Sequence, residues 1–130
     1  MKLLTLALLL SIASIAMAAQ PATLDHHRWN HRLLVVPNPT PAIEAELEKH
    51  RAALEERDVV TIRLEPDAPT TIAKQIATRF QLTAASKEIL LIGKDGRTAV
   101  RWPIGEFTFE KLFARIDAMP MRQREMKERE

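Results

Sequence analysis

The chain has 130 residues and no cysteine, which excludes disulfides, a thiol nucleophile and a cysteine-ligated metal. Its 19 lysines and arginines nearly balance 17 aspartates and glutamates, so the charge does not indicate a nucleic-acid-binding protein, although the sequence pI is about 9.2. The length fits one small domain whose single core needs no disulfides.

The N-terminal segment has the pattern of a secretory signal peptide. Lys2 precedes an almost wholly apolar run over residues 3–15, and the Ala-Met-Ala tripeptide at 16–18 suits cleavage there or one residue later. The run falls short of the roughly 20 residues that a helix needs to span a bilayer. We therefore predict a signal peptide over 1–18, export to the periplasm or out of the cell, and a single domain over 19–130 with no membrane anchor.

The first half of that domain predicts a strand, a helix and a second strand. Residues 33–36 form a continuous apolar run typical of a buried strand, and the proline-rich stretch 37–41 ends it. Apolar residues at helical spacing then predict a helix from Thr40 and Pro41 to about residue 57. Residues 59–64 alternate imperfectly, as in a half-exposed edge strand.

The second half predicts a helix, a β-hairpin and a last helix. Ile72, Ile76 and Phe80 recur at helical spacing after a threonine cap at 70 or 71. The apolar run 89–92 leads through Lys94-Asp95-Gly96-Arg97 into an alternating strand over 98–102. Thr108 caps a helix that Pro120 stops, and a charged tail begins at about residue 121.

The strands that are apolar on both faces are the first and the third, which places them at the centre of the sheet. A right-handed crossover makes the first two strands parallel neighbours, and the hairpin makes the last two antiparallel. We predict an α/β fold with a four-stranded mixed sheet in the order 2-1-3-4 and three helices on both faces. This is the minimal thioredoxin-like layout.

Four segments carry a resemblance to a known family: residues 28–35, 56–60, 91–96 and 116–126. On these segments the chain resembles an uncharacterised bacterial family catalogued as domain of unknown function 4174, with relatives among domains of animal extracellular-matrix proteins. The terminal segment is the most specific of the four. The residues that we take as the family signature are Trp29, Arg32, Arg57, Asp58, Lys94, Asp95, Gly96, Asp117, Met119 and Pro120.

The thioredoxin-like layout implies a reactive site at the loop after the first strand, and this chain has no reactive residue there. Residues 37–42 are followed by Ile43 and Glu44, where redox members carry a nucleophilic cysteine. Residues 86–88 replace the cis-proline segment of such enzymes. We therefore exclude thiol-disulfide and peroxidase chemistry, and expect a protein that is not an enzyme and uses no cofactor.

Three histidines offer an alternative site. His26, His27 and His31 lie within six residues, and in a helix His27 and His31 would share a face at a spacing that can bind zinc. The other interpretation is a polar lead-in to the first strand. Metal binding by these histidines is therefore the alternative function.

Two tryptophans and one aspartate are candidates of a weaker kind. Trp29 and Trp102 could form a platform for a sugar or a peptide, but we expect both in the core. Asp117 has no second carboxylate or histidine fixed beside it by spacing, so we expect it to pair with Arg122 or a turn amide.

The charged tail over 121–130 is either a partner-binding peptide or a solvated helix with charge pairs at i,i+4 spacing. It is the candidate interaction surface, with Met121, Arg122, Glu125 and Met126 as its residues, although its methionines could also pack on the domain. The expected function is noncovalent binding of an envelope or extracellular protein or glycan, with no nucleic acid involved. Variants at Arg122 and Glu125 are then expected to lose partner capture with little change in melting temperature. A hydrolase is the last alternative, because spacing shows no nucleophile-base pair.

Overall fold

The computed structural model describes residues 23–130, and the signal peptide predicted over 1–18 lies outside this range. Within it, no helix is long and apolar enough to cross a membrane.

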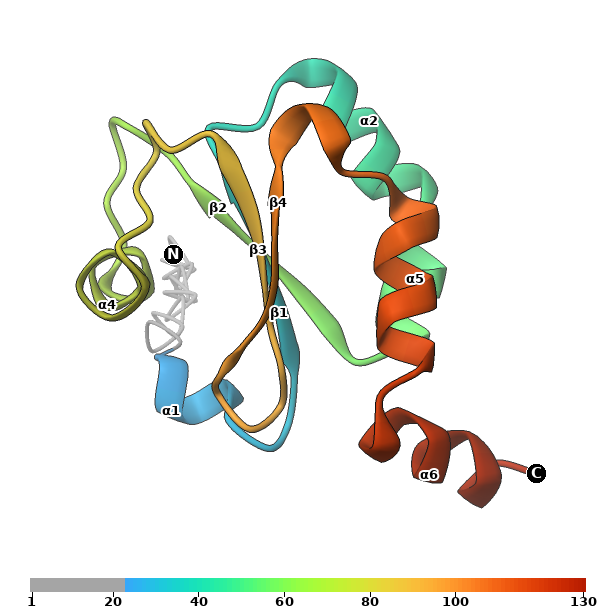
Figure 1. Ribbon diagram of the computed structural model, residues 1–130. Coiled ribbons are helices and arrows are strands. Elements are labelled where there is room, and N and C mark those ends of the chain that lie inside the picture. The colour runs from blue at the N-terminus through green and yellow to red at the C-terminus, as the bar shows by residue number, and fades with distance from the viewer. Residues whose placement is uncertain (1–22) are drawn as a thin grey trace, which may run out of the picture.

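A four-stranded mixed sheet forms the centre of the described chain (Figure 1). Its strands are β1 (Arg32–Pro37), β2 (Val59–Leu64), β3 (Glu88–Ile92) and β4 (Thr98–Pro103). Their order is β2-β1-β3-β4, with β1 parallel to β2 and antiparallel to β3, and β4 antiparallel to β3. The predicted α/β class, strand order and strand directions are therefore confirmed.

Residues 23–130 contain six α-helices and one 3-10 helix, where the sequence predicted three helices. They are α1 (Leu24–His27), α2 (Pro41–Lys49), α3 (Arg51–Glu56), α4 (Thr71–Phe80), the 3-10 helix (Ile104–Glu106), α5 (Phe109–Asp117) and α6 (Pro120–Glu128). The helix expected over 41–57 is interrupted at His50, which caps both α2 and α3. The charged tail forms α6, because Pro120 occupies the first helical position, where proline is tolerated.

Helices cover both faces of the sheet, and alternate residues of β1 serve two separate cores. Leu33 and Val35 pack in the cluster beneath α4, whereas Leu34 and Val36 pack in the cluster beneath α2, α3 and α5. Figure 1 shows α1 and α4 on one side and α2 and α5 on the other, with α6 beyond the end of α5. All six residues of β1 are buried, as expected for a central strand.

The two tryptophans differ in burial, and the core prediction was wrong for Trp29. This side chain is 58% exposed, because the residue turns the chain between α1 and β1 with a positive φ of 69°. Its backbone N–H donates to the Lys94 carbonyl at 2.6 Å, while the Arg28 guanidinium lies over the ring. Trp102 is half-buried and packs against the core, with an edge-to-face contact to Phe107.

Candidate functional site

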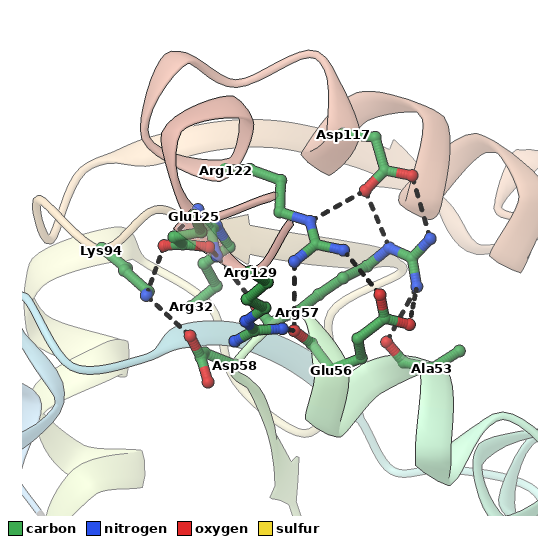
Figure 2. A network of polar contacts seen from close by, with 10 residues as sticks. All are labelled: Arg32, Ala53, Glu56, Arg57, Asp58, Lys94, Asp117, Arg122, Glu125 and Arg129. Atoms are coloured by element: carbon green, nitrogen blue, oxygen red, sulfur yellow. Dashed lines mark hydrogen bonds and ion pairs between the residues drawn. The ribbon is translucent and has the colours of Figure 1, made fainter. Parts of the chain in front are cut away.

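Charged residues from distant parts of the chain meet at the end of the sheet where β1 begins (Figure 2). They come from five segments: the start of β1, the stretch from the end of α3 to the residue before β2, the β3–β4 turn, the end of α5, and α6 with the residue that follows it. We call this cluster the charged network. Its members are Arg32, Glu56, Arg57, Asp58, Lys94, Asp117, Arg122, Glu125 and Arg129.

One half of the network is centred on Glu125 of α6. Arg32 donates to both oxygens of this carboxylate at 3.2 and 3.3 Å, and Lys94 Nζ donates to Oε1 at 2.6 Å. Lys94 also donates to Asp58 Oδ2 at 2.9 Å. Arg32 is 1% exposed and Lys94 9% exposed, so Glu125 supplies a counter-charge to two cations that are nearly out of solvent.

The other half is centred on Asp117, the C-terminal residue of α5. Arg57 donates to both oxygens of its carboxylate, from Nε at 3.0 Å and from Nη2 at 2.9 Å, and Arg122 Nε donates to Oδ1 at 3.2 Å. Arg122 also donates to the Glu56 carbonyl and carboxylate. The predicted pairing of Asp117 with Arg122 is therefore confirmed, and it joins α5, α6 and the end of α3.

Three carboxyl groups of the network, those of Asp58, Asp117 and Glu125, have lowered pKa values. Burial opposes ionisation of Asp58 and Glu125, but the hydrogen bond and charge of Lys94, together with Arg32, outweigh it and lower the pKa of both. The hydrogen bond from Arg57 lowers the pKa of Asp117. These shifts move the groups away from neutrality, which suits charge pairing and not general acid-base catalysis.

The four predicted tail residues differ in how far they are buried and in what they contact. Arg122 is 1% exposed and Glu125 points into the network, so both side chains are engaged within the chain. Met121 and Met126 are half-buried. Partner binding by this segment stays a prediction, but its two charged residues are turned towards the domain.

Sequence reasoning missed the network as a unit. Its residues come from five segments, and no helical or strand periodicity relates them to one another. The one available signal was that each of the four family-like segments carries charged residues: Arg32 in the first, Arg57 and Asp58 in the second, Lys94 in the third, Asp117 and Glu125 in the last.

A cavity of about 320 Å³ adjoins the network, between the β3–β4 turn and the junction of α5 with α6. We call it the hairpin cavity. Arg32 and Lys94 form part of its wall, Arg97 and Arg115 contribute two exposed guanidinium groups, and Met119, Pro120 and Met121 contribute apolar surface. Among residues 23–130, no carboxylate lies within ion-pair distance of Arg97 or Arg115.

The three histidines lie together around α1. His27 Nδ1 is 3.0 Å from His31 Nδ1, and the ring of His26 meets that of His27 edge-on. Burial, followed by the nearby charges of His31 and His26, lowers the pKa of the buried His27. In the described part of the chain, no group of three or more histidine, aspartate or glutamate side chains could hold a metal ion. The pair of His27 and His31 therefore has no third ligand there.

The region after β1, where the thioredoxin-like layout implies a reactive site, contains an ion pair between α2 and β2. Glu44 in the first turn of α2 accepts two hydrogen bonds from Arg63 on β2, at 2.6 and 2.9 Å. These bonds lower the pKa of Glu44. Nearby, His50 stacks on Phe109 in an apolar groove between α2 and α5.

Comparison with known proteins gives one match. The family model described as "Domain of unknown function (DUF4174)" matches residues 23–125, a range that includes every network member except Arg129. No curated protein and no solved structure matches the chain. The thioredoxin-like description of the layout therefore stays a prediction, whereas the strand order is observed.

Proposed function

The chain belongs to the family described as domain of unknown function (DUF4174), and we propose that it is a noncovalent binding module whose ligand site is the hairpin cavity. The observation that carries this proposal is the composition of the cavity wall. Arg97 and Arg115 line the hairpin cavity together with Met119 and Met121. The two guanidinium groups have no carboxylate partner within residues 23–130. Polar groups that converge on an apolar hollow are typical of ligand sites.

The charged network supports this proposal because it fixes the wall of the cavity. Met119 and Met121 lie at the junction of α5 and α6, and the contacts of Asp117 and Glu125 hold the two helices on either side of that junction. A site whose walls are fixed before binding loses less conformational entropy when a ligand enters. Arg32 and Lys94 belong to both the network and the cavity wall, so the two features are physically continuous.

Binding fits the chemistry of the region better than catalysis. The carboxyl groups of Asp58, Asp117 and Glu125 have lowered pKa values, and the chain has no cysteine to serve as a nucleophile. We therefore propose that the protein is not an enzyme. We also propose that it acts in the cell envelope or outside the cell, on the basis of the signal-peptide pattern, and that its partner is a component of that compartment.

Site-specific photocrosslinking tests the binding site. A photoreactive phenylalanine analogue replaces the exposed wall residue Thr98 in the full chain, in cells that produce the protein, so that both arginines are kept. A matched chain carries it at Arg51, which is 68% exposed on α3. We expect a discrete crosslinked product from position 98 and none from position 51. Equal labelling from the two positions, or no product from either, would contradict the proposed site.

A further inference from the structure

We infer that the hairpin cavity recognises an acidic peptide segment, in which a residue with a carboxylate is adjacent to a residue with an apolar side chain. This inference rests on the proposed function. Three features lead to this class of partner: the charge balance of the wall, a buried donor without a partner, and the apolar surface at the helix junction.

The charge balance of the wall favours an anion. Asp95 is the one acidic residue of the described chain in the wall, and its Oδ1 accepts a hydrogen bond from the backbone N–H of Arg97 at 3.0 Å. Lys94 and Arg32 are already paired with Asp58 and Glu125, but the guanidinium groups of Arg97 and Arg115 are not paired with a carboxylate in residues 23–130. Within residues 23–130, the Arg115 guanidinium makes one hydrogen bond, a long one of 3.5 Å, to the Ala99 carbonyl. These two side chains supply the forked donors that bind carboxylates.

Arg32 provides a second, independent observation. It is 1% exposed, its two terminal nitrogens donate to Glu125 and to the Arg57 carbonyl, and it forms part of the cavity wall. Its Nε–H has no hydrogen-bond partner in the described part of the chain. A buried donor without an acceptor costs free energy, and because this nitrogen is fully covered in the structure, a ligand oxygen recovers that cost only if side chains of the cavity wall shift on binding.

The apolar surface distinguishes a peptide from an inorganic anion. Ala99, Met119, Pro120 and Met121 make much of the wall, and methionine side chains adapt to ligands of varied shape. A strongly hydrated phosphate or sulfate gains nothing from such a surface. The volume, about 320 Å³, is at the small end of ligand pockets, so it suits one or two side chains of a larger partner.

Calorimetric titration of the purified protein tests this inference with defined probes. The probes are the blocked tripeptide acetyl-Leu-Glu-Leu-amide, its glutamine counterpart, sodium hexanoate and sodium sulfate. We expect the glutamate peptide to bind about tenfold or more tightly than the glutamine peptide, because a neutral amide forms no bidentate ion pair with a guanidinium group. We also expect it to bind more tightly than hexanoate or sulfate. The double variant Arg97→Gln/Arg115→Gln is expected to lose this preference, and the control Arg51→Gln to keep it.

The Nε–H resonance of Arg32 provides a readout that needs no change in the network. In nitrogen-edited NMR spectra we expect it to shift on addition of the glutamate peptide and to stay in place with the glutamine peptide. Equal affinity for the two peptides overturns the inference, and so does tighter binding of hexanoate or sulfate than of the glutamate peptide. If crosslinking from position 98 is observed in that case, the proposed function stands with a different ligand; if crosslinking also fails, the proposed function fails.

Discussion

Replacing Glu125 with glutamine is expected to destabilise the whole domain, although the residue lies in a short, highly charged C-terminal helix. The substitution keeps the shape of the side chain and removes its charge. Within residues 23–130, Arg32, 1% exposed, then has no carboxylate partner, and its acceptors are the Arg57 carbonyl and the single amide oxygen of the glutamine. Lys94 keeps its contact with Asp58.

The magnitude follows from burial. Removing one partner of a fully buried ion pair costs about 3 to 5 kcal/mol, because the other charge is left unpaired. Glu125 is 17% exposed and Lys94 retains a partner, so we expect a smaller loss of unfolding free energy, about 2 to 3 kcal/mol. For a domain of this size, this loss lowers the melting temperature by about 10 °C.

Urea and thermal unfolding measure this loss, and Glu128→Gln on the same helix is the control. Glu128 is exposed and makes no ion pair within residues 23–130, so its replacement is expected to change stability by less than about 0.5 kcal/mol. If Glu125→Gln proves as stable as Glu128→Gln, the network does not hold α6 on the domain. The expectation from sequence alone, a nearly unchanged melting temperature, would then be supported.

Two further predictions concern pH and the tryptophans. The lowered pKa values of Asp58, Asp117, Glu125 and His27 mean that the unfolded chain takes up protons first as pH falls. Stability is therefore expected to be highest above about pH 6.5 and to fall in two stages, first below that pH through His27 and then below about pH 4 through the carboxyl groups. In urea titrations across pH, His27→Gln should remove the first stage alone, and a single stage in the unchanged protein would contradict this assignment. Trp29→Ala is expected to change the unfolding free energy by less than about 1 kcal/mol, and Trp102→Ala to cost about 2 to 3 kcal/mol; similar losses for both in urea unfolding would contradict the difference in burial.

The fold was predictable from the sequence to the extent that local patterns determine it. Two continuous apolar runs identified the central strands, the Asp95-Gly96 turn identified the hairpin, and threonines 40, 70 and 108 cap helices as expected. Each of these signals lies within a few residues of the element that it specifies. The break at His50 was missed, because it does not interrupt the apolar stripe of that helix. Helix α6 was one of two interpretations of the charged tail, because no apolar stripe marks it.

The site depends on contacts over long separations, which local patterns do not contain. Arg32 and Glu125 lie 93 residues apart in sequence, and the family-like segments indicated that such residues matter without indicating that they touch. A charged residue in an amphipathic or highly charged segment is ordinarily expected at the surface. Arg122 departs from this expectation because Asp117 and Glu56 supply acceptors for its buried guanidinium group.

The charged network and the hairpin cavity share Arg32 and Lys94, but replacing a network residue and replacing a cavity arginine are expected to have different effects. Arg97 and Arg115 are exposed and outside the network, so their replacement should weaken binding of the acidic peptide while the unfolding free energy stays within about 0.5 kcal/mol of the original. Glu125 lies in the network, and its replacement should lower stability and, by loosening the wall at Met119 and Met121, also weaken binding. A stabilising osmolyte favours the compact domain, so it should restore binding to Glu125→Gln but not to the arginine variants. This difference separates residues that contact the ligand from residues that hold the site in place.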